Sequence, residues 1–142
     1  IALQTIVNST VLLKNKDATL PLATAGKKIA LIGKYCNQTM DKSYGQGSVY
    51  SGGGSGYVET KDERVITPLA GIKAGIQDAD SVTWSQDASA GEGADVAVVC
   101  LAAHSEEGWD RANYSLPEAQ WLVEEAWKHS SVKKVIVLAF VP

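Results

Sequence analysis

The side chains most suited to chemistry lie in one acidic loop, residues 105–111 (SEEGWDR). This loop follows an apolar run, Val96 to Ala103, of the kind typical of a strand buried on both faces of a sheet. In open α/β sheets, ligands bind beside the loops that follow the carboxyl ends of such strands. The sequence therefore places four ionisable groups and a tryptophan where a reaction could take place.

Carboxylates are the reactive groups that this loop offers. A carboxyl group shielded from water can keep its proton towards neutral pH and give it to a leaving group, so Glu106 and Glu107 are candidates for general acid/base catalysis. Glycoside hydrolysis most needs this chemistry, because one carboxyl protonates the glycosidic oxygen while another acts as nucleophile. Trp109 could stack on a sugar ring. The alternative is that Glu106, Glu107, Asp110 and Arg111 form a solvated loop with a local ion pair.

A second loop, residues 51–57 (SGGGSGY), is rich in glycine, which lets backbone come close to a ligand without strain. It lies in a long polar stretch, residues 35–65. Structureless connections of that length are uncommon in compact domains unless they are functional, so we predict a binding loop or lid. The glycines do not have the spacing or position of a dinucleotide fingerprint, and no phosphate-binding P-loop motif occurs. We therefore expect no cofactor.

Other function classes are disfavoured by composition and by missing motifs. The net charge of −3 and the pI of about 5.3, with scattered Lys and Arg, do not favour binding to nucleic acid or anionic lipid. No apolar stretch approaches the roughly 18 residues of a membrane span. His104 begins an H-x-E pattern that no C-x-x-C follows, and His129 is expected near a helix C-terminus in a structural role. We therefore predict no metal site.

Alternating strands and helices must position these loops. Short apolar runs predict strands over residues 28–33, 95–102 and 133–140, with a weaker candidate over 81–84. This alternation predicts an α/β fold, a three-layer α/β/α sandwich with a mostly parallel sheet. The 142 residues suit one domain, of 45% apolar and 20% charged residues.

Three helices are predicted from local signals. Leu3, Ile6, Val7 and Thr10 have the spacing of an amphipathic helix at the start of the chain. Thr67-Pro68 has the form of a helix N-cap followed by proline at the first position. Its buried face is expected to carry Leu69, Ile72 and Ile76. Ser115 and Glu118 have the form of a capping box, and the helix after them is expected to bury a stripe of Ala119, Leu122, Val123, Ala126 and Trp127.

The glycosylation sequons and the cysteines give information on the cellular compartment of the protein. Three N-glycosylation sequons begin at Asn8, Asn37 and Asn113, and together they favour a secreted or lumenal protein. Cys36 and Cys100 each follow or end a predicted strand, so a disulfide forms if those strands are neighbours. Two buried thiols are the alternative. Because the chain has no initiating Met and begins inside a predicted helix, we expect it to be a piece of a longer protein.

An ordered series of motifs resembles the C-terminal α/β-sandwich domain of glycoside hydrolase family 3, which includes β-glucosidases. The resemblance covers nearly the whole chain, which makes it more specific than any one motif. The motifs are residues 11–15 (VLLKN), 20–22 (LPL), 28–33 (KIALIG), 53–56 (GGSG), 67–69 (TPL), 94–99 (ADVAVV), 107–111 (EGWDR) and 116–117 (LP) with Gln120.

The resemblance implies a division of labour between domains. In this family a preceding (β/α)8 barrel carries the nucleophilic aspartate, and the C-terminal domain of many members supplies the acid/base glutamate. In the family's E-G-x-D-R pattern this glutamate precedes the Gly, so the matching residue is Glu107, with Glu106 as the fallback. Asp110 and Arg111 match the D-R part of the pattern, and the resemblance implies that they order the loop through an ion pair. The residues that match the family's sugar-facing loop are Gly53, Gly54, Ser55 and Gly56, and with Glu106 and Trp109 they are the expected substrate-binding residues.

The chain also departs from the family's pattern. It contains no barrel, and the family's domain continues beyond the strand that ends near Pro142, so residues 1–142 are expected to be a partial domain, incomplete at the C-terminus and inactive alone. Lys34-Tyr35-Cys36 stands where many members have proline after the strand glycine. One alternative is a non-catalytic glycan-binding or structural extracellular protein derived from this domain. A flavodoxin-like nucleotide binder is disfavoured by the missing phosphate motifs.

Overall fold

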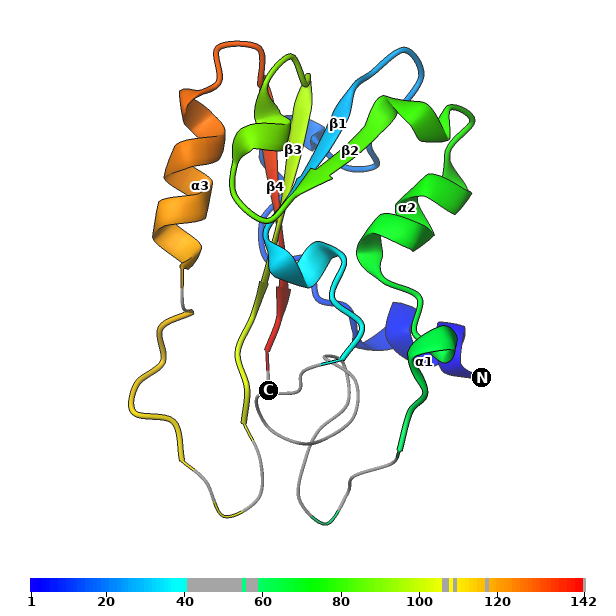
Figure 1. Ribbon diagram of the computed structural model, residues 1–142, viewed down its shortest axis with the longest axis vertical. Coiled ribbons are helices and arrows are strands. Elements are labelled where there is room, and N and C mark those ends of the chain that lie inside the picture. Colours follow the sequence, from blue (N-terminus) through cyan, green and yellow to red (C-terminus); the bar gives the residue numbers. More distant parts are fainter. Residues whose placement is uncertain (41–54, 56–58, 106–107, 109, 117, 142) are drawn as a thin grey trace.

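A computed structural model describes residues 1–40, 55, 59–105, 108, 110–116 and 118–141. Four parallel strands form one sheet in the order β2-β1-β3-β4. The strands are β1 (Ile29–Ile32), β2 (Val82–Ser85), β3 (Val96–Ala102) and β4 (Lys134–Phe140). The helices are α1 (Ala2–Ser9), α2 (Pro68–Gly75) and α3 (Ala119–Lys128). The predicted α/β fold with a parallel sheet is confirmed, because α2 and α3 cover opposite faces of this sheet (Figure 1).

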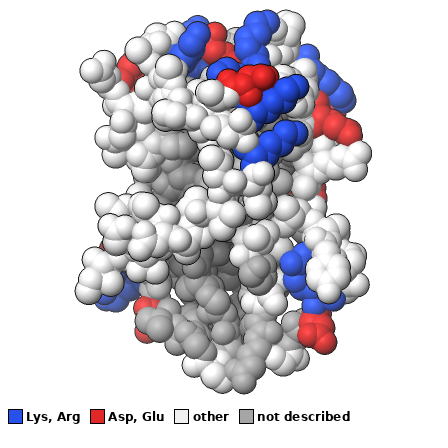
Figure 2. Space-filling view, turned by 180° about the vertical axis from the view of Figure 1, so that it is seen from behind, with Lys and Arg blue, Asp and Glu red and all other residues white. Residues whose placement is uncertain are grey.

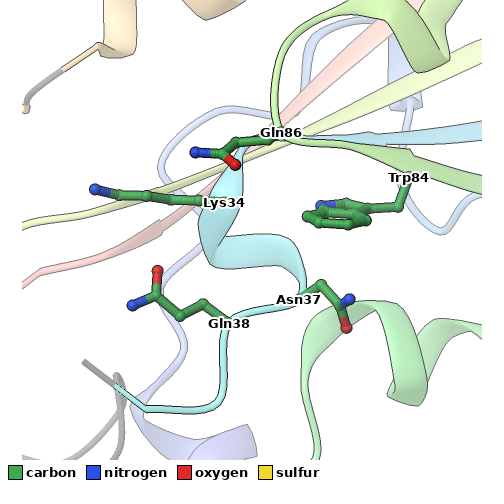
Figure 3. A pocket seen from close by; sticks show the side chains of 5 residues that line it. All are labelled: Lys34, Asn37, Gln38, Trp84 and Gln86. Atoms are coloured by element: carbon green, nitrogen blue, oxygen red, sulfur yellow. The ribbon is translucent and has the colours of Figure 1, made fainter. Parts of the chain in front are cut away.

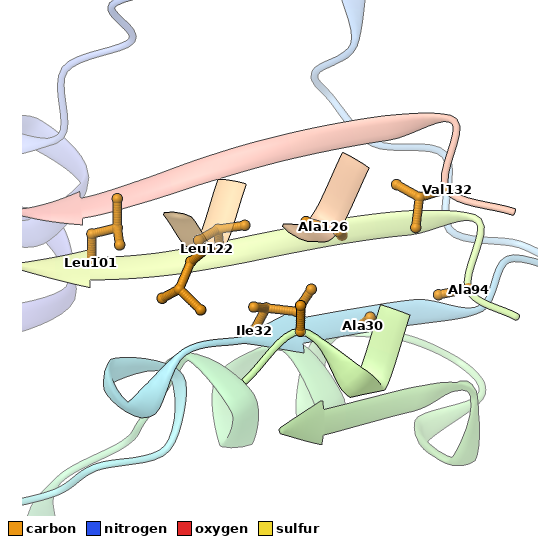
Figure 4. Packing of buried hydrophobic residues seen from close by; sticks show 10 residues of the cluster. Ala30, Ile32, Ala94, Leu101, Leu122, Ala126 and Val132 are labelled. Atoms are coloured by element: carbon orange, nitrogen blue, oxygen red, sulfur yellow. The ribbon is translucent and has the colours of Figure 1, made fainter. Parts of the chain in front are cut away.

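The two central strands are buried on both faces, as their apolar runs predicted. Every residue of β1 and β3 is buried. Alternate residues point to opposite faces of a strand, so the sheet has two cores. One core joins Ala30, Ile32, Ala97, Val99 and Leu101 to Leu122 and Ala126 of α3 (Figure 4). The other joins Ile29, Leu31, Val82 and Val98 to Leu69 and Ile72 of α2 and to Ile76.

The predicted helix starts and buried helix faces are confirmed only in part. Thr67 caps α2 as expected, because its Oγ1 accepts a hydrogen bond from the Ala70 N–H at 3.2 Å. The capping box at Ser115 was wrong: the Ser115 hydroxyl donates to Asn113 Oδ1, and α3 begins only after Glu118, which has a positive φ of 62°. The stripe on α3 is correct at Leu122 and Ala126, but Trp127 is 53% exposed.

β4 is less buried than the continuous apolar run over residues 133–140 suggests. It lies at the edge of the sheet, paired only with β3 among the described strands, and none of its residues is fully buried. Val137, for example, is half-exposed. The apolar run was the correct signal for a strand, but it does not show how many neighbours that strand has.

A disulfide joins Cys36 to Cys100, which decides between the two alternatives for these cysteines. Cys100 lies in β3, and Cys36 ends a short 3-10 helix, η2 (Lys34–Cys36), that follows β1. Because β1 and β3 pair side by side, the two Cα atoms come within 5.1 Å, and both residues are fully buried. The bridge therefore fixes the backbone after β1 to the neighbouring strand.

His129 links the end of α3 to a second 3-10 helix, η7 (Ser89–Gly91). It is the C-terminal cap residue of α3, so its predicted place near that end is confirmed. The ring Nε2 lies 2.8 Å from the Ala88 carbonyl oxygen. A Cβ atom on Gly91 would lie 2.5 Å from the ring's Cδ2. The glycine therefore makes room for the imidazole.

Gly91→Ala is expected to lower the free energy of unfolding by about 1–3 kcal/mol, because the added methyl displaces the His129 ring. Gly75→Ala is the matched control, since a Cβ there meets open space at the end of α2. That variant should match or exceed the unchanged protein in stability. Urea denaturation measures both, and equal midpoints for Gly91→Ala and the unchanged protein would contradict this role of the glycine.

None of the helices in the described part of the chain has the length and apolar character to span a membrane. Within the same residues, no three acidic, His or Cys side chains gather as a metal site.

Candidate active site

The candidate site lies at the carboxyl edge of the sheet. Going along the chain, β1 connects through α2 to β2 on one side, whereas β3 connects through α3 to β4 on the other. The strand order therefore reverses between β1 and β3. In open α/β sheets the crevice outside the carboxyl ends at such a reversal is where ligands bind. Gly33 and Lys34 follow β1 at this point, and the acidic loop follows β3.

Gly33 lies where three strands come close together at this edge. Its φ is 103°, and a Cβ atom here would lie 2.7 Å from the Cys100 carbonyl oxygen of β3. Its N–H donates to the Ser85 carbonyl oxygen of β2, and its own carbonyl oxygen accepts from the Trp84 indole Nε1, each at 3.0 Å. Glycine is required here because its conformation and the close approach of β3 both exclude a side chain.

A hollow of about 210 Å³ opens beside this turn. It is lined by Lys34, Asn37, Gln38, Trp84 and Gln86, which come from η2 and the residues after it and from the end of β2 (Figure 3). Two features together suit a ligand with both polar groups and an apolar face: the amides donate and accept hydrogen bonds, and the indole offers an apolar face. The disulfide at Cys36 fixes the backbone that carries Lys34, Asn37 and Gln38.

A second, larger hollow of about 410 Å³ is lined by Gln86, Asp87, Glu118 and Trp121. Gln86 lines both hollows, so the two are neighbours along the carboxyl edge. The Ser89 hydroxyl donates to Asp87 Oδ1 at 2.6 Å and the Ser89 N–H does so at 2.9 Å. These two hydrogen bonds hold the pKa of Asp87 below its ordinary value. Asp87 is therefore a carboxylate acceptor at neutral pH and not a proton donor.

Most of the predicted site residues lie outside the described residues. This applies to Glu106, Glu107 and Trp109 of the acidic loop, and to Gly53, Gly54 and Gly56 of the glycine loop. Ser55 is described, and it is exposed. The structure fixes where the acidic loop leaves the sheet, because Ser105 follows β3 at the carboxyl edge.

The described residues of the acidic loop make one contact that the sequence did not predict. The Arg111 Nη2 donates to the Ser115 carbonyl oxygen at 3.0 Å. Within the described part of the loop, no ion pair joins Arg111 to Asp110. Gly108 has a φ of 76°, a conformation that favours glycine. Arg111 therefore connects the loop to the segment before α3 through a main-chain oxygen.

Sequence reasoning missed the residues that line the two hollows. Lys34 was noticed only as a departure from a family pattern, and Trp84 only as part of a weak strand. Gln86 and Trp121 were not singled out, because they are far apart in the sequence and line one hollow only in the folded chain. The polar residue directly after a strand was the one usable clue at Gln86.

Comparison with known proteins gives consistent matches. Residues 10–141 match the model of the glycosyl hydrolase family 3 C-terminal domain. A probable β-glucosidase M of Emericella nidulans is 31% identical over 157 aligned residues, covering 96% of this chain and 20% of that protein. An exo-α-(1→6)-L-arabinopyranosidase of Bifidobacterium longum is 30% identical over 161 aligned residues, covering 98% of this chain and 20% of that protein.

Solved structures agree with the sequence matches. A β-D-glucoside glucohydrolase from Trichoderma reesei superimposes with a TM-score of 0.71 at 28% identity, over 92% of this chain and 21% of that one. A β-glucosidase from Chaetomella raphigera gives 0.73 at 25% identity, with the same coverage. The chain thus spans about a fifth of the length of the relatives that it matches.

Proposed function

Because the chain belongs to glycoside hydrolase family 3, whose C-terminal domain it matches, we propose that it serves as the accessory domain of a retaining β-glycosidase. In this proposal the complete enzyme removes terminal β-linked sugars. The chain supplies the acid/base residue, Glu107, and part of the sugar site. A preceding (β/α)8 barrel supplies the nucleophilic carboxylate, so residues 1–142 alone do not hydrolyse glycosides.

One observation carries this proposal: the E-G-x-D-R sequence begins five residues after β3, at the carboxyl edge where the strand order reverses. A loop at this edge faces outward from the sheet, so its carboxylate can reach a sugar held by a neighbouring domain. Both relatives named above support glycosides as the substrate class, and the probable β-glucosidase supports a β-linkage.

The chemistry assigned to Glu107 has two steps. The protonated carboxyl first donates its proton to the glycosidic oxygen as the barrel carboxylate attacks the anomeric carbon from the opposite face. A covalent glycosyl-enzyme forms and the aglycone leaves as an alcohol. The Glu107 carboxylate then takes a proton from water, which attacks the anomeric carbon and releases the sugar with its configuration retained.

The rest of the sugar site is assigned to the two loops. Gly53, Gly54, Ser55 and Gly56 bring main-chain N–H groups close to the sugar, which glycine permits because it has no side chain. Glu106 accepts hydrogen bonds from sugar hydroxyls, and Trp109 stacks on a ring face. The larger hollow, at Trp121 and Gln86, is assigned to the next sugar unit.

Trp121→Ala in the complete enzyme is expected to raise KM for disaccharide or longer substrates about 5- to 10-fold, with kcat little changed, because a stacking surface is lost. Trp127→Ala is the matched control. Both tryptophans lie on α3 and are half-exposed, but only Trp121 lines the hollow. Steady-state kinetics measure KM and kcat, and equal effects of the two substitutions would contradict the assignment of the hollow to the sugar site.

The same hollow is the observation that favours a second candidate function, non-catalytic glycan binding. A half-exposed indole beside an amide and two carboxylates has the chemistry of a carbohydrate contact surface. A glycan array separates the two functions. Specific binding by residues 1–142 alone supports the binding role, whereas the accessory-domain proposal expects little binding without the barrel.

The intact mass of the source protein tests the accessory-domain proposal. The proposal expects a mass several times the 15.0 kDa of this chain, and a mass near 15.0 kDa would contradict it.

We also propose a secreted or lumenal location, supported by the exposure of all three sequon asparagines, Asn8, Asn37 and Asn113. A loss of mass on enzymatic removal of N-glycans tests that location.

A further inference from the structure

The smaller hollow at the carboxyl edge has an N-glycosylation sequon in its wall. Asn37 begins the sequon at residues 37–39 (NQT), and it lines this hollow together with Trp84. Asn8 and Asn113, which begin the other two sequons, line neither hollow. Asn37 therefore differs from the other two asparagines, because a sugar attached to it has a concave surface beside it.

The Asn37 side chain is oriented for such an attachment. Its Oδ1 accepts a hydrogen bond from the Thr67 hydroxyl, with 3.4 Å between the two oxygens. Thr67 is buried and caps α2, so this contact turns the amide oxygen towards that helix (Figure 3). The Nδ2 atom, which is the atom that carries an N-linked sugar, has no hydrogen bond to any of the described residues, and Asn37 is exposed.

The Trp84 indole forms an apolar wall of the same hollow. Its Nε1 donates to the Gly33 carbonyl oxygen at 3.0 Å, which holds the ring in one orientation, and 39% of the residue is exposed. In Figure 3 the ring lies across from Asn37. Gln38 is held as well, because its Nε2 donates to the Met40 carbonyl oxygen at 2.9 Å. The hollow thus offers a sugar an aromatic face for its C–H groups and an amide oxygen for a hydroxyl.

The charges around the hollow favour a neutral occupant. Of its described lining residues only Lys34 is charged, and the Lys34 Nζ lies 4.9 Å from the centroid of the Tyr35 ring, as in a cation–π contact. Figure 2 shows that Lys and Arg of the rear face gather mainly over the upper end of the molecule, whereas β3 and β4 run towards the lower end (Figure 1). A neutral sugar therefore fits this surface better than an anion does.

We propose that Asn37 carries an N-linked glycan, and that the first N-acetylglucosamine ring of this glycan occupies the smaller hollow against the Trp84 indole. In the modification, Asn37 Nδ2 attacks the anomeric carbon of a sugar carried on a lipid diphosphate. The new N–C bond replaces the C–O bond to the diphosphate, which leaves as an anion. The nitrogen loses one of its two protons to a base of the glycosyltransferase.

The covalent link allows so small a hollow to hold a sugar. Its volume of about 210 Å³ is below the roughly 300 to 1,000 Å³ of pockets that bind free small molecules. The link keeps the sugar at an effective concentration of about millimolar or more, so weak contacts are sufficient. The protein's own glycan then fills the smaller hollow, and the larger one stays open to substrate. This inference rests on the proposed secreted or lumenal location.

Enzymatic deglycosylation of the complete secreted protein under native conditions tests the inference. Peptide-N-glycosidase releases a glycan and converts its asparagine to aspartate, so peptide mass spectrometry over time gives the release rate at each sequon. Trp84→Ala should speed release from Asn37 about 10-fold or more and leave the rates at the other sequons unchanged. Trp127→Ala is the matched control and should leave the Asn37 rate unchanged, because Trp127 is half-exposed but lines neither hollow.

Trp84→Phe keeps an aromatic face, so it tests the contact even where Trp84→Ala fails to fold. Its Asn37 glycan should be released within about threefold of the rate in the unchanged protein. Equal rates in Trp84→Ala and the unchanged protein, or fast release from Trp84→Phe, would overturn the proposed contact. A bare Asn37 beside a glycosylated Asn8 or Asn113 would overturn the inference alone, whereas three bare asparagines would overturn the proposed location as well.

Discussion

Glu107→Gln in the complete enzyme is expected to lower kcat about 10²- to 10⁴-fold for substrates with poor leaving groups, such as alkyl glycosides. The amide has the size of the carboxyl group but cannot donate a proton to the glycosidic oxygen. Substrates with good leaving groups, such as nitrophenyl glycosides, depart as anions without that proton. For them the first step should change little, and removal of the covalent sugar should become rate-limiting.

Kinetics with a series of aryl glycosides of increasing leaving-group pKa measure this effect. For Glu107→Gln the loss should grow with the leaving-group pKa. Glu106→Gln is the matched control, because the two glutamates adjoin and only Glu107 precedes the Gly of the E-G-x-D-R sequence. A loss that does not depend on the leaving group, or one that appears only in Glu106→Gln, would contradict the assignment.

Removal of the disulfide is expected to have the largest effect on stability. Cys36→Ala combined with Cys100→Ala should lower the free energy of unfolding by about 4 kcal/mol, because the bridge joins residues 64 apart and restricts the unfolded chain. Both cysteines are fully buried, so the loss of their sulfur atoms from the core adds to this effect.

Urea denaturation of residues 1–142 measures the effect, with the unchanged protein under reducing conditions as an independent comparison. Reduction removes the bond and keeps both sulfur atoms, so the difference between the two experiments gives the packing contribution. A change below about 1 kcal/mol on either treatment would contradict the stabilising role of the bridge.

The fold was predictable where burial leaves a local pattern. The strands β1 and β3 were found because strands buried on both faces are continuous apolar runs. α2 was found because Thr67-Pro68 is a local cap signal. The start of α3 was missed because the Ser115 hydroxyl bonds to Asn113, a competing local turn that the capping pattern does not reveal.

The site was predictable only in part, because it depends on neighbours in space. The acidic loop was located because it directly follows a recognisable strand. The sequence did not decide whether Cys36 and Cys100 form a disulfide. The bond requires β1 and β3 to be neighbours in the sheet, and the order of the strands in the sheet is known only from the structure. The larger hollow was not expected, since Gln86 and Trp121 lie 35 positions apart and meet only in the folded sheet.

Chemical rescue of Glu107→Gln by azide tests the central claim most directly. Azide attacks the anomeric carbon of the covalent glycosyl-enzyme without needing a base, so it replaces water in the step that the variant cannot assist. With a nitrophenyl β-glycoside, added azide should restore turnover of the variant and yield the β-glycosyl azide, while the unchanged enzyme is unaffected. An absence of both rescue and glycosyl azide in Glu107→Gln, with both present in Glu106→Gln, would contradict the account.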